Sequence, residues 1–426
     1  MAAERRIGLG SAAILVVANM IGAGVFTTSG LALADLGRRE PVLLAWGLGG
    51  LLAMCGTLSY GALARRMPES GGEYMFLSRT VHPLAGFLAG WVSLLAGFTA
   101  PIAASAIGLQ AYLADSFGVT SRPEWIGTAA IIAAGLMHGL RLQAGLVLQN
   151  LAVALKLAII GGFVAAGIVL APAGSCGVTD DPTPLRLSAF AVTLVWISFA
   201  YSGWNAAVYV AGEVRDPERN LHRALWLGTA LVTVIYLALN AVFLYAADAA
   251  KLAGKIEVGA IAAEALGGPG LRRVVSALVA LALFTSISSM VMAGPRVYAR
   301  MAEDGLLPRL FAAGRSVPQA AVMAQVALAL LVLWVSGLAA LLGYIGFTLG
   351  LSAAGTVAAL VALRRREGPE RLPVPAYPWA QAIFVLATLL VSGFMAAREP
   401  AQAALGLLTV AAGLPVYALM RATSER

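Results

Sequence analysis

A single lysine lies deep within a long apolar segment, where a charged group is costly. Lys156 occurs in "NLAVALKLAIIGG", far from either end of that segment. In a membrane, a lysine at such depth costs about 2.5–3.5 kcal/mol even on the mildest scale. Its amine could act as a fixed cation or exchange a proton. The alternative is a lysine whose ammonium reaches the membrane surface along its own alkyl chain.

Another apolar segment carries several hydroxyl groups close together. Its stretch "LFTSISSM" carries Thr285, Ser286, Ser288 and Ser289. Hydroxyl oxygens accept hydrogen bonds from an ammonium without adding a second charge.

Two further apolar segments carry glycine where a membrane helix most needs its backbone hydrogen bonds. One reads "ANMIGAGVFTTSG", with Gly22 and Gly24 at its centre, and the other reads "WISFAYSGWN", with Ser202 and Gly203 at mid-depth. A broken helix exposes N–H groups on one half and carbonyls on the other. The former attract a carboxylate and the latter an ammonium, which suits an amino acid zwitterion. Close packing between helices is the other explanation for such glycines.

The composition places these segments in a membrane. Of the 426 residues, 60% are hydrophobic and only 12% are charged, whereas soluble domains carry about 25% charged residues. The mean hydropathy is +0.85. Apolar runs of the length that a bilayer requires recur about twelve times. They are 9–34, 41–64, 84–114, 124–139, 147–171, 187–212, 223–247, 271–301, 318–337, 339–363, 377–397 and 400–420. The sequence predicts an all-α integral membrane protein.

The two interrupted segments occupy corresponding places in the chain. They are the first and the sixth apolar runs, and each opens a group of five. Interrupted helices in matching positions indicate a transporter site built from inverted repeats. We predict one transmembrane domain over residues 1–426, with repeat one at about 9–171, repeat two at about 187–363 and two extra helices at about 377–420.

The distribution of charged residues and the number of cysteines limit the possible functions further. Most Lys and Arg residues fall on one side when the N-terminus is placed inside, so both termini are predicted to be cytoplasmic. The net charge of +8 reflects this excess, and no folded domain remains for nucleic-acid binding. Cys55 and Cys176 are not expected to pair. The chain has no HExxH and no catalytic pair at mid-membrane depth, so we expect no enzyme, cofactor or metal.

Four motifs, in order, resemble those of the amino acid–polyamine–organocation transporter superfamily. They are "MIGAGVFTTSG", "PESGGEYMFLSR", "FAYSGWNAAVYVAGEVRDPERNLHRAL" and "GPRVYARMAEDGLLPRLF". The third is most similar to the L-type amino acid transporters and their bacterial relatives, and the resemblance covers about residues 8–365. It implies a LeuT-type fold of five plus five inverted helices. It also implies transport of amino acids or related amines without sodium.

The resemblance assigns roles to residues at the two breaks. It implies that the substrate carboxylate lies near the N–H groups of Ala23 and Gly24. The amino group would lie near the carbonyls of Met20, Ile21, Phe199, Ala200 and Ser202. Phe199 matches the aromatic residue that closes over the substrate, although an ordinary core aromatic is the alternative. Trp204 and Asn205 match the continuation of the motif, with Trp204 as a second gate residue. Many L-type members have serine where this chain has Ala23, so one hydroxyl contact is missing.

The resemblance also implies a role for the buried lysine. In related transporters, a lysine on the fifth helix occupies the position that sodium takes in sodium-coupled members. It bridges the broken first helix and the eighth helix. Carried onto this chain, Lys156 would replace sodium, with Ser286 and Ser289 as oxygen partners. We expect Lys156 to couple conformation to substrate, with or without proton transfer.

The predicted substrate is a neutral L-amino acid, moved by exchange. No Asp or Glu falls at mid-depth in the first, third, sixth, eighth or tenth apolar run. The alternatives are proton-coupled symport, and transport of cationic amino acids or polyamines held by aromatic faces. The segment "ADSFGVTSRPEW" lacks the cysteine that links a heavy subunit in eukaryotic L-type members, so no such partner is expected. The last two helices could support a homodimer, and the expected location is the cell inner (plasma) membrane.

Overall fold

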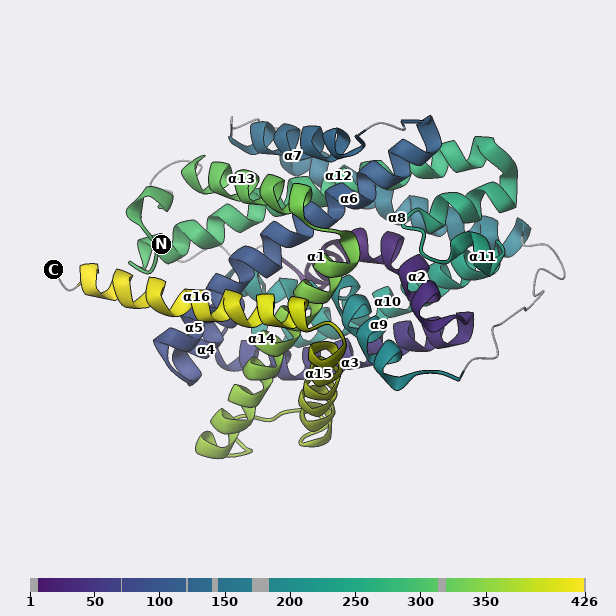
Figure 1. Cartoon of the computed structure of the whole chain (residues 1–426). Helices are drawn as coiled ribbons and strands as arrows, with labels where there is room; N and C mark the ends of the chain where they lie inside the picture. The colour runs from purple at the N-terminus through teal and green to yellow at the C-terminus, as the bar shows by residue number, and fades with distance from the viewer. Residues whose placement is uncertain are drawn as a thin grey trace.

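The chain is helical almost throughout (Figure 1). The computed structural model describes residues 7–69, 71–119, 122–139, 145–170, 184–312 and 319–424. Within these ranges the only β-structure is an isolated bridge between Ile7 and Val214. Cys176 lies outside the described residues. The helices are α1 (Leu9–Met20), α2 (Ala23–Leu36), α3 (Arg39–Arg66), α4 (Gly72–Thr80), α5 (Pro83–Val92), η1 (Ser93–Thr99), α6 (Ala100–Phe117), α7 (Glu124–Gly139), α8 (Gly145–Leu170), α9 (Leu187–Ala200), η2 (Ala206–Glu213), α10 (Pro217–Tyr245), α11 (Ala249–Leu252), α12 (Val258–Glu303), η3 (Arg309–Phe311), α13 (Gln319–Val335), α14 (Leu338–Glu367), α15 (Trp379–Arg398) and α16 (Pro400–Ser424).

The helices confirm the prediction of an all-α membrane protein. In the described part of the chain, seven helical stretches are long and apolar enough to cross a membrane. The number rises to eight if α1 and α2 together form one bent span. Three further apolar helices are shorter: Ala154–Leu170 within α8, α9 and α13. The figure of about twelve spans and the inverted repeat remain predictions.

Both predicted interruptions are present. The axes of α1 and α2 differ by 43°. In the sixth apolar run, α9 ends at Ala200 and the chain turns before it continues as the 3-10 helix η2. The first break lies earlier than the sequence suggested. It consists of Ile21 and Gly22, whereas Ala23 and Gly24 already belong to α2.

The glycines at the breaks allow the two interrupted helices to touch. A Cβ atom on Gly24 would lie 2.5 Å from the Cα atom of Ala200. Gly203 has φ +95°, and its Cβ atom would lie 2.8 Å from the carbonyl oxygen of Asn19. Neither position has space for a Cβ atom, and the position of Gly203 also requires a left-handed backbone. Glycine alone meets these requirements, because it has no Cβ atom and adopts positive φ without strain. The two breaks therefore pack directly against each other.

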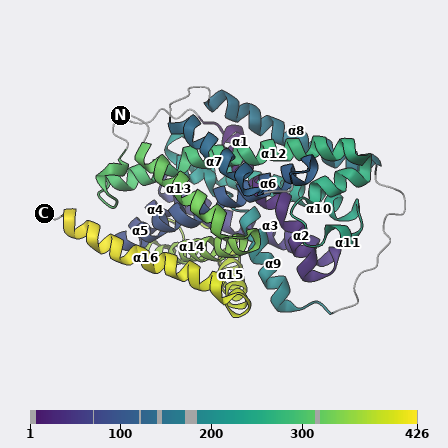
Figure 2. The same ribbon diagram turned by 45° about the horizontal axis from the view of Figure 1, so that its top comes forward.

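The remaining helices surround this centre. α10 packs against α1 and α3, and α12 packs against α6 and α8. The third apolar run contains a π-helical turn, η1. Pro101 follows it and has no backbone N–H to donate to a helical hydrogen bond. α12 is longer than the predicted eighth run, because an additional helical segment precedes a kink at Gly267 and Gly268. Figure 2 shows α16 along one edge of the bundle, beside α14 and α15.

Candidate functional site

The two broken helices bring two carbonyl groups to one hydroxyl. The Oη atom of Tyr236, on α10, lies 2.5 Å from the carbonyl oxygen of Met20 and 3.0 Å from that of Ala200. These carbonyls belong to the last residues of α1 and α9. A tyrosine hydroxyl has one proton, so it donates to one of the two at a time. The other carbonyl retains capacity for a further donor.

The start of α2 offers backbone donors beside this point. Gly22 is the N-cap of α2, with an extended backbone and no side-chain cap. The first N–H groups of a helix have no partner within the helix. Those of Ala23 and Gly24 are therefore directed toward the break. A Cβ atom on Gly22 would meet only the carbonyl oxygen of Met20, at 3.9 Å, so the space beside this residue is open.

Lys156 links the first break to α12. Its side chain is only 5% exposed. Its Nζ atom donates to the carbonyl oxygen of Ile21 at 3.3 Å and to the Oγ atom of Ser286 at 2.8 Å. Ser286 in turn donates to the carbonyl of Ala282. The structure thus brings together two of the three residues predicted to replace sodium. The third, Ser289, donates to Thr285 in its own helix.

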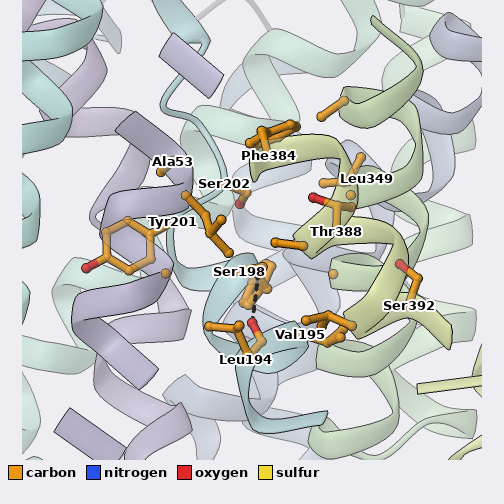
Figure 3. A pocket seen from close by; sticks show the side chains of 18 of the residues that line it. Ala53, Leu194, Val195, Ser198, Tyr201, Ser202, Leu349, Phe384, Thr388 and Ser392 are labelled. Atoms are coloured by element: carbon orange, nitrogen blue, oxygen red, sulfur yellow. Dashed lines mark hydrogen bonds between the residues drawn. The ribbon is translucent and has the colours of Figure 1, made fainter. Parts of the chain in front are cut away.

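The side chains at the second break line a pocket between α3, α9, α14 and α15 (Figure 3). Phe199, Ser202 and Trp204 contribute from the break. The other lining residues are Gly49, Leu52, Ala53, Leu194, Val195, Ser198, Tyr201, Gly346, Leu349, Gly350, Ala353, Phe384, Ala387, Thr388, Val391 and Ser392. None of these residues carries a charge. The pocket therefore fits an apolar or hydroxyl-bearing group better than a charged one.

The two predicted gate residues are placed differently. Phe199 is buried beside the pocket, and its carbonyl accepts the N–H of Ser202 at 2.9 Å. Trp204 packs edge-on against Tyr60, with 4.6 Å between ring centroids, and its ring also faces Phe384 at 6.3 Å. Trp204 is therefore held by α3 and α15 as well as lining the pocket.

Sequence reasoning missed a buried carboxylate beside the second break. Glu73, in α4, is 6% exposed. Its carboxylate accepts hydrogen bonds from the hydroxyl of Tyr60 at 2.5 Å, the amide of Asn205 at 3.2 Å and the hydroxyl of Ser352 at 2.8 Å. Burial raises the pKa of the Glu73 carboxyl, and the three hydrogen bonds partly offset this rise. The motif "PESGGEY" reads as a loop, so nothing in it indicated burial.

Two other features at this site were also not predicted. Tyr236 lies within an ordinary apolar helix, and no local pattern shows which way its hydroxyl points. The chain before α1 pairs with the chain at the end of η2, because Ile7 donates to the carbonyl of Glu213 at 3.0 Å and Arg215 donates to that of Ile7 at 2.8 Å.

Within the described residues, no group of three or more His, Cys, Asp or Glu side chains could hold a metal ion.

Comparison with known proteins identifies the family. The model of one family, described as amino acid permease, matches residues 7–413. The chain belongs to the amino acid permease family. This permease is 28% identical to the serine/threonine exchanger SteT of Bacillus subtilis over 431 residues, which are 97% of this chain and 96% of the relative.

Two mammalian relatives show similar identity. The permease is 28% identical to the human large neutral amino acids transporter small subunit 2 over 436 residues, covering 98% of this chain and 81% of the relative. It is 26% identical to the mouse Asc-type amino acid transporter 1 over 437 residues, covering 98% and 82%. These findings confirm an amino acid–polyamine–organocation transporter, a multi-pass membrane protein of amino acid transport. The family and these relatives are transporters rather than enzymes.

Proposed function

We propose that this permease is a sodium-independent exchanger of neutral L-amino acids. It works by alternating access around a mid-membrane site between the two broken helices. The observation that carries this proposal is the convergence of helix ends. The carbonyls of Met20 and Ala200 meet at one hydroxyl, and the N-terminal end of α2 begins at Ala23 beside them. A zwitterion needs both kinds of backbone group at one place.

The substrate backbone is held by main-chain atoms. Its carboxylate binds the N–H groups of Ala23 and Gly24, at the positive end of α2. Its ammonium binds the carbonyls at the end of α1 and of α9. These carbonyls belong to Met20, Ile21, Phe199, Ala200 and Ser202. A carbonyl oxygen has two lone pairs, so the bonds from Tyr236, Lys156 and the Ser202 N–H leave room for a further donor.

The pocket at the second break includes no residue of α1 or α2, and its uncharged lining favours an uncharged substrate side chain beside Phe199. The pocket beside Phe199 and Ser202 has no charged lining residue. A lysine or arginine side chain would lose its hydration there without an ionic partner, which is costly. The printed names of the relatives, a serine/threonine exchanger and a large neutral amino acids transporter, support the same substrate class. Phe199 closes over the bound substrate, and Trp204, which packs against Tyr60 of α3, supports that closure.

Lys156 takes the place of a coupling sodium ion. Its ammonium joins the carbonyl of Ile21 in the first break to Ser286 on α12, with Ser289 one turn away. A fixed cation at this point does the structural work of a bound ion without any dependence on sodium. A buried amine can also exchange a proton. Proton-coupled symport is therefore the second candidate function.

We also propose the setting in which the permease works. It lies in the cell inner (plasma) membrane with both termini in the cytoplasm, as the distribution of Lys and Arg favours. It functions without a disulfide-linked heavy subunit, because the connection between α6 and α7 contains no cysteine. α15 and α16, which lie outside the two proposed repeats, offer a surface for a homodimer.

Counterflow in vesicles tests the proposal. The purified protein is reconstituted into vesicles preloaded with a mixture of unlabelled amino acids, and entry of each labelled L-amino acid is measured in sodium-free buffer. Empty vesicles that contain the protein, and protein-free vesicles, serve as controls. We expect neutral amino acids to enter only the loaded vesicles. Addition of sodium leaves the rate unchanged.

Each other outcome excludes a defined part of the proposal. Comparable entry into empty vesicles, increased by an inward proton gradient, replaces exchange by proton symport. Displacement of labelled substrate by arginine or a polyamine, far better than by any neutral amino acid, replaces the neutral substrate by a cationic one. Entry of no amino acid in any vesicle overturns the assigned substrate.

A further inference from the structure

The carboxylate of Glu73 joins three elements of the bundle. Its partners are Tyr60 on α3, Asn205 in the second break and Ser352 on α14. Glu73 itself lies in the first turn of α4, the short helix between the second and third apolar runs. We call these four residues the Glu73 latch.

The start of α4 packs tightly against η2, the second half of the broken sixth run. Gly72 has φ +56°, and a Cβ atom there would lie 2.4 Å from the ring of Tyr209 on η2. Tyr60 also contacts the ring of Trp204, the residue before Asn205. η2 is therefore held at its beginning by the Glu73 latch, and its far end pairs with Ile7.

Glu73 has an unusual set of partners for a buried acid. All three donors are neutral, and in the described part of the chain no Lys, Arg or His forms an ion pair with Glu73. The titratable groups that face it are the hydroxyls of Tyr60, on α3, and Tyr209, on η2. Other charged contacts of α4 lie elsewhere on the helix: Tyr74 with Asp304, Arg366 with the carbonyl of Thr80, and Arg79 with Glu69.

The ionised form of Glu73 depends on its three donors. A buried carboxylate without enough hydrogen bonds is strongly unfavourable, and a protonated carboxyl is much less so. If η2 moves away from α4, the amide of Asn205 leaves with it. The carboxylate then loses one donor, and proton uptake becomes more favourable. The conformation in which η2 has left α4 therefore binds a proton on Glu73 more tightly than the conformation in which they are in contact. By thermodynamic linkage, protonation of Glu73 in turn favours the separated conformation.

We propose that Glu73 is a positioning residue of the transport cycle, which when ionised holds η2 against α4 and when protonated releases it. This proposal rests on the proposed transport function, since it assumes that the second half of the sixth run moves. It makes opening at this end of the permease proton-dependent. It does not require that a proton crosses the membrane with each substrate.

Hydrogen–deuterium exchange tests the Glu73 latch directly. Backbone exchange of residues 203–214 is compared between the wild type and Glu73→Gln, over a series of pH values from about 4 to 8, in detergent without substrate. Glutamine imitates the protonated carboxyl. At pH 8 we expect this segment to exchange about tenfold faster in the variant, because a hydrogen bond to a charged group contributes a factor of this order. As the pH falls and Glu73 becomes protonated in the wild type, the two proteins converge. The ratio at each pH removes the intrinsic pH dependence of exchange.

Ser352→Ala is the matched control. It keeps the titrating carboxyl but removes one donor, so the pH midpoint of exchange should move to higher pH than in the wild type. A ratio of Glu73→Gln to wild type that stays the same across the whole pH series overturns the proposal. An unchanged midpoint in Ser352→Ala overturns it as well. If Glu73→Gln does not fold, the comparison between Ser352→Ala and wild type alone decides the question.

The readout separates this proposal from the proposed function. Exchange is measured without substrate, so a correct latch and a wrong substrate class give pH-dependent exchange together with no amino acid entry into vesicles. A wrong latch and a correct substrate class give amino acid counterflow together with exchange that does not respond to Glu73→Gln.

Discussion

At the scale of single residues, loss of the Lys156 ammonium should lower the transport rate. Lys156→Met removes the ammonium but keeps a chain of similar length, so the carbonyl of Ile21 and the hydroxyl of Ser286 lose their shared donor. A buried polar group without a partner costs about 1–3 kcal/mol. We expect amino acid counterflow to fall about tenfold or more, since about 1.4 kcal/mol corresponds to a factor of ten. Vesicle uptake measures this rate.

Ser286→Ala provides the graded comparison for Lys156. It leaves the bond from Lys156 to Ile21 and removes only the second acceptor. The rate should therefore lie between those of the wild type and Lys156→Met. Lys156→Ala with the wild-type rate and the wild-type pH dependence would show that the lysine has no part in coupling.

The hydroxyl of Tyr236 connects the two broken helices. Its hydroxyl lies within hydrogen-bond distance of the ends of both α1 and α9, at the carbonyls of Met20 and Ala200. Tyr236→Phe keeps the ring and removes this link. We expect counterflow to fall by about tenfold, because a net hydrogen bond contributes about 0.5–1.5 kcal/mol and two helix ends depend on this one.

Tyr201→Phe is the control for that change. Its ring lies 5.2 Å from the ring of Tyr236, and its hydroxyl donates to the carbonyl of Trp46, within the regular helix α3. The variant loses a buried hydroxyl of the same cluster but no link between broken ends. Equal losses in the two variants would mean that Tyr236 only stabilises the packing.

At the scale of elements, the glycines of the first break are not equivalent. A Cβ atom on Gly24 would lie 2.5 Å from the Cα atom of Ala200, whereas one on Gly22 would meet nothing closer than 3.9 Å. Overpacking of this kind costs about 1–3 kcal/mol. We expect Gly24→Ala to lower the melting temperature by several degrees and to abolish counterflow. Gly22→Ala is the matched control, because its extended backbone (φ −128°, ψ −153°) accommodates alanine.

Thermal unfolding in detergent and vesicle uptake measure both glycine variants. If Gly24→Ala were as stable and active as Gly22→Ala, the direct contact between α2 and α9 would not be required for the fold. Loss of activity in Gly22→Ala at unchanged stability would instead indicate that the open space beside Gly22 is occupied by substrate.

The sequence predicted the interrupted elements but not their mutual contacts. Glycine at mid-depth is unusual enough to be visible locally, so the breaks near Gly22 and Gly203 were found without a structure. The pairing of Lys156 with Ser286 was expected from the family resemblance, which implies that the fifth-helix lysine bridges the broken first helix and the eighth helix. The roles of Tyr236 and Glu73 depend on helix rotation and on how a short connecting helix folds inward, and neither leaves a periodic pattern. The exact end of α1 depends on the contact with α9, which lies far away in the sequence.

At the scale of the whole molecule, orientation decides which end of the site faces the cytoplasm. Lys251 is exposed in α11, and Arg371 is exposed between α14 and α15. Three helices, α12, α13 and α14, separate them, and an odd number of crossings places two positions on opposite faces of the membrane. The excess of Lys and Arg around Arg371 favours the cytoplasmic face for that position. We therefore expect Lys251 to lie outside and Arg371 inside.

Cysteine labelling in intact cells checks this arrangement. Cys55 and Cys176, the two native cysteines, are replaced by alanine, and Lys251→Cys or Arg371→Cys is introduced in turn. A membrane-impermeant maleimide should label the first variant in intact cells and the second only after the cells are opened. The reverse pattern would place Glu73 and the Ile7–Val214 bridge on the outer side, and the release of η2 would then respond to the external pH. Labelling of both in intact cells would mean that one of the three helices between them does not cross the membrane, which contradicts the repeat proposed for residues 187–363.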